Sequence, residues 1–319
     1  MDNNSITVDN KRRKWVAISI TTVLAALLSI WGIYGIGQYG LALFILTPLF
    51  IGMAPAILYG HKHGISYARS RELGFLTLGI FTTILILFAL EGLICIAMAA
   101  PPAILLTWLG SVIGCAAVDK KPAKAHLLLW LTVLAIPSVA FIEDDHSPEL
   151  TSVVTSIEIR ADAATVWKNV IEFPQLDEPD EFIFKTGIAY PTSATIDGDG
   201  VGAVRLCNFT TGSFVEPITV WDEGRLLKFD VVEQPAPLRE LSFWDIDAPH
   251  LHDYFVSKRG QFRLIPLPNG NTLLEGTTWY YHNIKPAFYW KIWSEGIVHK
   301  IHQRVLSHIK KNAELQMRN

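Results

Sequence analysis

The sequence is short of charge and of cysteine. Only 18% of its 319 residues are Asp, Glu, Lys or Arg, and three are cysteine, whereas an average soluble protein has about 25% charged residues. Cys95 and Cys115 lie in apolar runs and Cys207 is alone in the polar second part, so a disulfide scaffold is excluded. A glycine-rich phosphate loop, a nucleophile elbow and a CxxC motif are also absent from the sequence. With half of the residues hydrophobic, the composition excludes a disordered or fibrous chain.

The charged residues that are present are distributed unevenly. Residues 1–142 contain 10 basic and 5 acidic residues, whereas residues 143–319 contain 17 basic and 25 acidic ones, a net charge of −8. The first part is too poor in charge for a soluble domain, and the second is too rich to be embedded in lipid. We therefore expect a membrane anchor in residues 1–142 and a separate domain in residues 150–319. The net acidic charge of that domain argues against nucleic acid as a partner.

Five apolar runs in the first part are each a candidate membrane span, which needs about 20 residues. They are Trp15–Gly37, Leu41–Tyr59, a run that begins at Leu73, a run that ends near Val118, and the shorter Leu127–Ile142. Both Glu91 and the doublet Pro101-Pro102 could separate the third run from the fourth, and we place the break near the prolines. Glu91 then reads as a carboxylate at the membrane interface, and the helices as an anchor rather than a pore.

The positions of lysine and arginine predict the orientation of these spans. The basic residues of the first part lie in three segments: residues 11–14, the loop that carries Lys62, Arg69 and Arg71, and the loop that carries Lys120, Lys121 and Lys124. The turns at residues 38–40 and around Pro101 contain none. With five spans, all three basic segments lie on the cytoplasmic side. The sequence therefore predicts a protein of the bacterial inner membrane with an extracytoplasmic C-terminal domain.

The second part has the hydrophobic pattern of β-strands along most of its length and that of a helix at its end. Residues 152–160 have the period of two of a half-buried strand, Asp162 is a helix N-cap residue, and residues 174–181 are irregular. The further predicted elements are a helix at 163–173, strands at 201–209, 213–221, 226–232, 260–267 and 272–282, a long excursion at 233–254, and a helix of some thirty residues after Pro286 that ends near Glu314. A curved antiparallel sheet against a long helix leaves an apolar cavity between them.

Four segments carry a resemblance to a known superfamily. They are Ile157–Trp167 (IEIRADAATVW), Arg259–Leu264 (RGQFRL), Leu274–Trp279 (LEGTTW) and Ile297–His302 (IVHKIH). With this element order, residues 150 to 315 resemble the SRPBCC superfamily, which has the START-like or Bet v 1-like helix-grip fold, and most resemble its polyketide cyclase/dehydrase and lipid transport branch. The resemblance implies an α+β fold with a cavity for a hydrophobic ligand. It does not imply one activity, because function depends on the site rather than the fold.

Glu216 is the most informative candidate in that cavity. Period-two alternation with Phe214, Ile218 and Val220 places its carboxylate inside, where it would need a partner such as Arg205. A buried acid of this kind could bind a polar head group or act as a general acid. The alternative is that a bulge or edge at the following proline turns Glu216 to solvent. The sequence leaves these two readings equal.

The remaining candidates are aromatic residues and histidines. Trp244, His250, His252 and Tyr254 lie in the long excursion and could cover the mouth of the cavity, although a solvated polar loop explains them as well. Tyr280 on the last strand and His302 on the C-terminal helix complete the set of candidate ligand-binding residues.

Two features of the sequence could suggest a metal, and neither does so strongly. Glu295, His299 and His302 follow at spacings of four and three, so one edge of a helix could present all three as zinc ligands. An ion pair and hydrogen bonds at the helix boundary explain the same residues, and we predict neither metal nor cofactor. Residues 197–200 (DGDG) contain too few acids for a calcium loop and read as a hairpin turn.

Two functions are compatible with these residues. The first is a membrane-tethered binding module for a hydrophobic small molecule or lipid. The second is an enzyme of cyclase, dehydratase or hydrolase type, with Arg205, Glu216 and a histidine of the excursion as working groups. The second is weaker in one respect, because no motif links these groups to one another.

Overall fold

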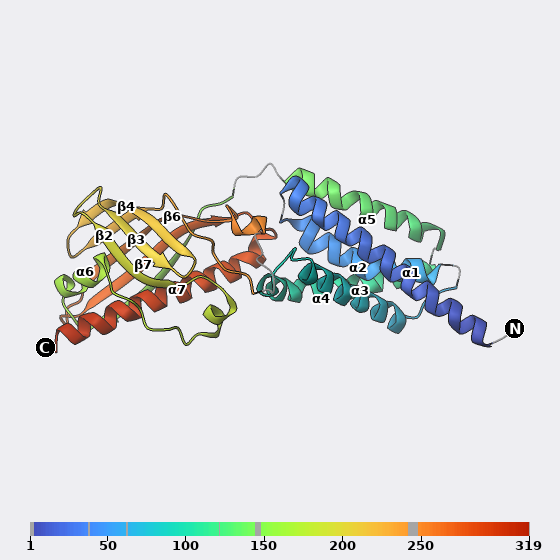
Figure 1. Ribbon diagram of the computed structural model, residues 1–319, viewed down its shortest axis with the longest axis horizontal. Coiled ribbons are helices and arrows are strands. Elements are labelled where there is room, and N and C mark those ends of the chain that lie inside the picture. The colour runs from blue at the N-terminus through green and yellow to red at the C-terminus, as the bar shows by residue number, and fades with distance from the viewer. Residues whose placement is uncertain are drawn as a thin grey trace. The chain divides into compact units, whose positions relative to one another are not determined.

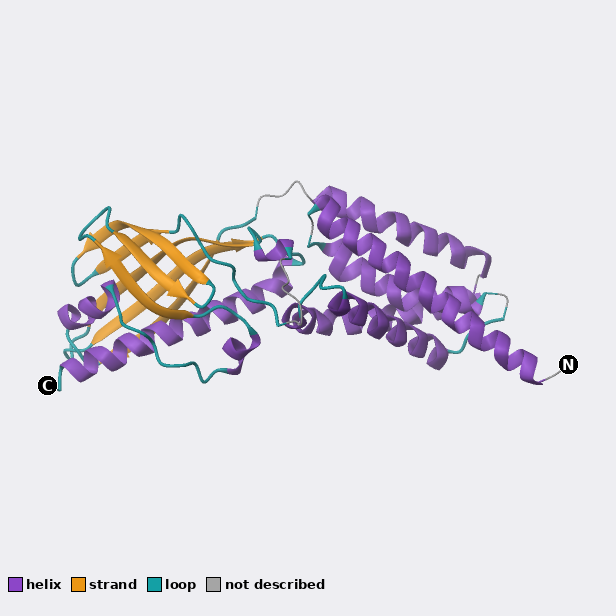
Figure 2. Cartoon of the chain, in the orientation of Figure 1, coloured by secondary structure: helices purple, strands orange, loops and turns teal. Residues whose placement is uncertain are grey.

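The computed structural model of the protein describes residues 3–37, 39–61, 63–120, 122–143, 148–241 and 248–318. The chain divides into two units (Figure 1). The first contains residues 1–147 with the short stretches 241–249 and 284–286, and the second contains the remainder. Helices make up the first unit, whereas the second combines a sheet with helices (Figure 2).

The first unit contains five helices that are long and apolar enough to cross a membrane. Their elements are α1 (Asn3–Ile30) continued by the wider turns of η1 (Trp31–Ile36), η2 (Ala42–Leu46) continued by α2 (Thr47–Gly60), α3 (Tyr67–Leu87), α4 (Leu93–Lys120) and α5 (Pro122–Ile142). The number of apolar helices and their order along the chain agree with the prediction from the sequence.

The predicted break between the third and fourth helices was wrong. The observed break lies between Leu87 and Leu93, and Pro101-Pro102 are inside α4. Ala89 has a left-handed backbone (φ 54°), which ends α3. Prolines are tolerated inside apolar helices because neighbouring groups satisfy the backbone carbonyls that they leave free. The turn therefore contains Glu91, the alternative break point, and carries no lysine or arginine.

Helices α2 and α4 pack with their backbones in contact. A Cβ atom on Gly52 would lie 2.1 Å from the carbonyl oxygen of Thr107, and one on Gly110 would lie 2.2 Å from that of Leu49. Such distances leave no room for a side chain, so glycine is required at both positions. This close approach is typical of helices that associate through small residues.

The second unit contains one seven-stranded antiparallel sheet with the strand order β1-β7-β6-β5-β4-β3-β2. Its elements are β1 (Thr151–Ile159), α6 (Ala163–Ile171), η4 (Phe182–Thr186), β2 (Pro191–Asp197), β3 (Val204–Phe209), β4 (Gly212–Asp222), β5 (Leu226–Asp230), η5 (Pro249–Leu251), β6 (Phe255–Pro266), β7 (Thr272–His282) and α7 (Ala287–Gln316). The long helix α7 lies along the curved sheet (Figure 1). This is the α+β helix-grip architecture that the resemblance implied.

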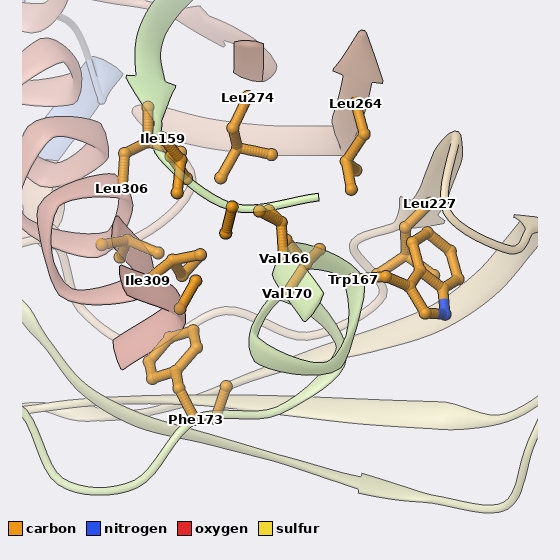
Figure 3. Packing of buried hydrophobic residues seen from close by; sticks show 14 of the residues in the cluster. Ile159, Val166, Trp167, Val170, Phe173, Leu227, Leu264, Leu274, Leu306 and Ile309 are labelled. Carbon is orange, nitrogen blue, oxygen red and sulfur yellow. The ribbon is translucent and has the colours of Figure 1, made fainter. Parts of the chain in front are cut away.

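Helices α6 and α7 cover the inner face of the sheet. Val166 and Trp167 of α6 and Leu306 and Ile309 of α7 are each at most 2% exposed, and they pack together on sheet residues (Figure 3). The sheet contributes Ile159, Leu227, Leu264 and Leu274 to this core. Asp162 caps α6 as predicted, because its Oδ1 accepts a hydrogen bond from the Thr165 amide at 2.9 Å. Burial of this apolar set supplies most of the driving force for folding of the unit.

A bulge in β4 changes which residues face inward. Ile218 pairs with Phe229, but the next partners are Val220 with Lys228, so Thr219 has no partner across the ladder. Trp221 therefore takes the inward position and packs edge to face on Trp167, with ring centroids 5.5 Å apart. The predicted inward orientation of Val220 was wrong, because the extra residue shifts the alternation by one.

The long excursion ends at Tyr254, as predicted, but the strand after it begins earlier than predicted. Strand β6 begins at Phe255, not Gly260. Asp253, two residues before this strand, has a left-handed backbone (φ 60°) that redirects the chain. Residues 242–247 of the excursion lie outside the described residues. The other predicted strands and helix α7 differ from the observed bounds by at most three residues.

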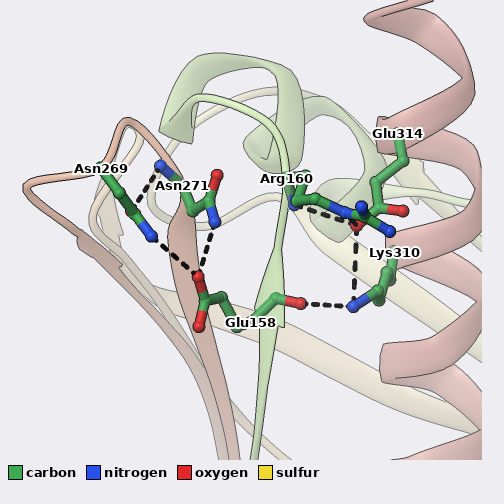
Figure 4. A network of polar contacts seen from close by, with 6 residues as sticks. All are labelled: Glu158, Arg160, Asn269, Asn271, Lys310 and Glu314. Atoms are coloured by element: carbon green, nitrogen blue, oxygen red, sulfur yellow. Dashed lines mark hydrogen bonds and ion pairs between the residues drawn. The ribbon is translucent and has the colours of Figure 1, made fainter.

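Polar contacts join the far end of α7 to the sheet. Glu158 of β1 accepts hydrogen bonds from Asn269 and Asn271 of the β6–β7 turn, at 3.1 and 2.6 Å (Figure 4). Lys310 of α7 donates to the Glu158 carbonyl at 2.7 Å and lies 3.6 Å from the Glu314 carboxylate. The first strand, the last hairpin and the last helix are thus joined at one place, which fixes the helix against the sheet.

Candidate functional site

A cavity of about 120 Å³ lies between the sheet and α7. Strands β3 to β7 and the middle of α7 line it, and the lining is largely aromatic and aliphatic. Its apolar side chains include Phe209, Phe214, Phe229, Phe255, Phe262, Val298, Ile301, Val305 and Leu306. The cavity exists because the sheet curves around a straight helix, as the element order predicted.

Arg205 and Glu216 form an ion pair in the wall of this cavity. They are direct partners across β3 and β4, and Nη1 of the arginine contacts Oε2 of the glutamate. Their side chains are 1% and 7% exposed. The inward reading of Glu216 and its pairing with Arg205 are therefore what the structure shows, and the alternative orientation toward solvent was wrong.

Aromatic rings surround the guanidinium group of Arg205. Its Cζ atom lies 5.5 to 5.6 Å from the ring centroids of Phe173, Phe229 and Phe262. Such cation–π contacts offset part of the cost of removing the charge from water. Nε donates to the carbonyl of Ile171 at 3.1 Å. Nη2 is buried and has no hydrogen-bond partner among the described residues.

The ion pair and the neighbouring thiol of Cys207 each have one protonation state at neutral pH. Burial raises the pKa of the Glu216 carboxyl, and the attraction of Arg205 opposes that rise. Arginine does not lose its proton in proteins, and a lone buried charge is very unfavourable, so we expect the pair to stay ionised at neutral pH. Burial raises the pKa of the Cys207 thiol to about 12. That thiol stays protonated and is a poor nucleophile.

His302 uses both of its ring nitrogens within the protein. Nδ1 lies 3.0 Å from the hydroxyl of Thr155 on β1, and Nε2 lies 2.8 Å from that of Thr278 on β7. Burial, with a smaller contribution from His299, lowers the pKa of His302 to about 4. His302 is therefore neutral at physiological pH and connects α7 to two strands.

The helical edge that could have held a metal is occupied by other contacts. His299 is exposed, and its Nδ1 lies 2.7 Å from the Thr155 hydroxyl. Glu295 forms an ion pair with Lys291, one turn away, at 3.7 Å. These are the boundary ion pair and hydrogen bonds that the sequence offered as the alternative to zinc.

Three of the other predicted candidates are outside the described lining of the cavity. Tyr280 is fully buried between β7 and α7, where its hydroxyl lies 2.8 Å from that of Ser294. His252 is exposed and Tyr254 is half-buried, and both are outside the described lining.

Two candidates of the excursion cannot be placed in the site. The structure describes only the backbone of His250, and Trp244 lies outside the described residues. Of the eight predicted residues, the structure thus brings Arg205, Glu216 and His302 to the cavity.

Several cavity residues were not singled out from the sequence, although a signal for them existed. Phe229 follows the buried Leu227 by two residues on β5, and Phe262 precedes the buried Leu264 by two on β6. Period-two alternation would have placed both rings on the inner face. Leu306 lies next to Val305 and extends the predicted apolar stripe of α7.

Comparison with known proteins supports no activity for the chain. No family model matches the sequence, and no curated protein does. Norcoclaurine synthase from Thalictrum flavum is similar in structure, with 16% identity, a TM-score of 0.36, and coverage of 55% of this chain and 100% of that one. The Zhui aromatase/cyclase from Streptomyces sp. R1128 has 13% identity, a TM-score of 0.36, and coverage of 53% and 96%. A protein from Nitrosospira multiformis has 18% identity, a TM-score of 0.35, and coverage of 53% and 100%.

Such similarities say nothing about activity, and the fold assignment rests on the molecule itself. The strand order β1-β7-β6-β5-β4-β3-β2, the helix α6 after the first strand and the long helix α7 define it. The C-terminal part of this chain therefore has the helix-grip fold.

Proposed function

We propose that the protein binds a hydrophobic or lipid-like molecule in the cavity of residues 150–319 and that residues 1–142 tether this domain to a membrane. The observation that supports binding is the cavity itself, which is enclosed by phenylalanine rings and by a charge-balanced Arg205–Glu216 pair. Pockets for small hydrophobic ligands have this composition, an apolar wall with a few fixed polar groups. Five apolar helices support the tether.

The polar groups of the cavity favour binding over catalysis. The Glu216 carboxylate is engaged with Arg205, the Cys207 thiol is protonated, and His302 has a partner at each ring nitrogen. A general acid or base must reach the substrate proton within hydrogen-bond distance. The enzyme hypothesis required a histidine of the excursion, and one of its two candidates, His252, is not part of the described lining.

The ligand can be identified from the protein as purified. We expect full-length protein isolated from membranes to carry an extractable apolar molecule that mass spectrometry detects. Ile301→Trp, which fills the cavity from α7, should reduce the bound amount at least tenfold. Ile292→Trp on the same helix is the matched control, because Ile292 is 68% exposed. Equal loading of both variants would overturn the cavity as the binding site.

We propose further that the C-terminal domain is extracytoplasmic and that the anchor lies in the inner membrane of a bacterium. The support is the charge pattern of the loops: three basic segments alternate with turns that lack lysine and arginine, and the observed turn around Glu91 keeps this pattern.

Single cysteines test this sidedness. In a chain whose own three cysteines are replaced, a membrane-impermeant maleimide on intact spheroplasts should label Glu149→Cys and leave His63→Cys unlabelled. Both positions are exposed. Labelling of His63→Cys alone would reverse the orientation and place the domain in the cytoplasm.

A further inference from the structure

The size of the cavity limits what it can enclose. Its volume is about 120 Å³, and an engineered apolar cavity of about 150 Å³ is known to hold benzene. The cavity therefore has room to enclose one ring, whereas most of a long acyl chain would lie outside it. The phenylalanine side chains that line it favour a flat aromatic molecule, since ring–ring contacts add to the energy of burial.

Each residue of the buried ion pair in the cavity wall has one polar atom with hydrogen-bonding capacity left over. Glu216 contacts Arg205 through Oε2, and no described residue donates a hydrogen bond to its Oε1. Nη2 of Arg205, whose side chain is 1% exposed, has no partner in the described part of the chain. The wall thus offers one acceptor and one donor side by side on neighbouring strands. The third polar candidate, His302, has both nitrogens occupied.

The charge of the pair decides the charge of its ligand. Arg205 and Glu216 balance each other, so an anion or a cation held by them would bring a third, uncompensated charge to two buried side chains. A neutral hydroxyl group avoids that cost, because it donates one hydrogen bond and accepts others. It can satisfy Oε1 and Nη2 together, whereas a carbonyl or ether oxygen satisfies only Nη2 and a hydrocarbon satisfies neither.

We infer that the cavity binds an uncharged, single-ring molecule through a hydroxyl group held by Arg205 and Glu216. This inference rests on the proposed binding function and narrows its ligand class. The apolar wall holds the ring, and the buried pair selects the hydroxylated ring from plain hydrocarbons and from aromatic acids.

Three probes that differ in one substituent test this selection. Fluorine NMR of full-length protein in nanodiscs at pH 7 would measure binding of 4-fluorophenol, 4-fluorotoluene and 4-fluorobenzoate. In a purely apolar cavity the toluene binds better, since water solvates the phenol more strongly. We expect the reverse order here, with 4-fluorophenol bound most tightly and 4-fluorobenzoate not bound. This comparison uses the unmodified chain and does not depend on the folding of a variant.

The double variant R205M/E216M then locates the preference. Both replacements are unbranched apolar side chains of similar size, and exchanging a buried ion pair for apolar residues is often neutral for stability. The ratio of the toluene and phenol dissociation constants should fall at least tenfold in this variant, because hydrogen bonds to charged groups account for the difference. An unchanged ratio would overturn the inference, as would tighter binding of 4-fluorobenzoate than of 4-fluorophenol.

Failure of the inference can be told apart from failure of the proposed function. Ile301→Trp should abolish binding of both 4-fluorophenol and 4-fluorotoluene, and the exposed Ile292→Trp should leave both unchanged. If Ile301→Trp changes neither, the cavity is not a binding site and both proposals fail. If it abolishes binding of a toluene probe that the unmodified chain prefers, the binding function stands and the hydroxyl-selective site is wrong.

Discussion

The two units of this chain bury polar groups in different ways. In the helical unit the buried polar side chains are mostly serine and threonine, and several of their hydroxyls donate to backbone carbonyls, such as Ser70 to Ser111 O at 2.6 Å and Thr107 to Pro48 O at 3.2 Å. In the C-terminal unit a complete ion pair, Arg205–Glu216, is buried among phenylalanine rings. Burying a short hydroxyl side chain costs little free energy, whereas a buried charge needs an oppositely charged partner.

The two units also differ in how far their large apolar side chains are exposed. Large apolar side chains of the helical unit such as Leu27, Leu105 and Trp130 are 59 to 64% exposed. In the C-terminal unit the sheet leucines of the core, Leu227, Leu264 and Leu274, are instead at most 3% exposed on the inner face of the sheet. Apolar side chains gain no hydrophobic free energy by moving out of lipid, so helices in a membrane pack through small residues and short polar groups. In water they do gain free energy on burial, and the core of the C-terminal unit is built by this hydrophobic effect.

Breaking the ion pair should have the largest effect. Glu216→Gln leaves the Arg205 charge buried without its partner, and we expect it to destabilise the C-terminal unit by about 3–5 kcal/mol. Hydrogen exchange followed by mass spectrometry, on full-length protein in detergent, would localise the loss to residues 148–240. The control is R205M/E216M, which removes both charges and should stay close to the unmodified protein. Equal losses in the two variants would mean that packing, not charge, is responsible.

The corresponding test of the helical unit adds a single methyl group. Gly52→Ala would place a Cβ atom 2.1 Å from the Thr107 carbonyl oxygen and force α2 and α4 apart. Overpacking of this kind costs about 1–3 kcal/mol. Gly79→Ala on α3 is the control, since a Cβ there meets no atom within 4 Å. Unfolding in SDS followed by circular dichroism should separate the two variants, and similar midpoints would contradict the close packing of these helices.

The smallest effect concerns pH and should be confined to the C-terminal unit. The pKa of His302 is lowered to about 4 in the folded chain, and an unfolded histidine titrates near 6.5. Between these values the unfolded state binds more protons, so stability is complete above pH 6.5 and falls as the pH drops toward 4. The loss by pH 5 should reach about 2 kcal/mol. His302→Gln, compared in thermal unfolding between pH 7.5 and 5, should lose less, and parallel profiles would contradict this.

The parts of the fold that depend on local pattern could be predicted from the sequence. Alternation identified β1 and gave the inward orientation of Glu216 as one of two equal readings, and the Asn269-Gly270 signal located the turn between the last two strands. Both depend on neighbours within a few residues. Even the Arg205–Glu216 pair follows, because one short turn connects the two strands and fixes their register.

The parts that depend on distant contacts could not be predicted. The two threonines at the nitrogens of His302 are separated from it by 147 and 24 residues, and the pairing needs the register of β1 against β7. The α3–α4 turn was misplaced for a different reason. Proline is a strong helix breaker in water, but in an apolar bundle its missing hydrogen bond is tolerated, and α3 ends instead at Leu87, two residues before the left-handed Ala89.

The bulge in β4 gives this strand one more residue than its partner requires. Thr219 is exposed and separates two runs, Phe214 to Ile218 and Trp221 onward, that keep opposite parity along the chain. Loss of Thr219 would restore simple alternation and leave Glu216, Ile218 and Trp221 all facing inward. Loss of any single residue between Phe214 and Ile218 would turn the residues on one side of the gap to the other face of the sheet. Among single deletions within β4, one at the bulge therefore keeps the inward positions of this strand, whereas one between Phe214 and Ile218 does not.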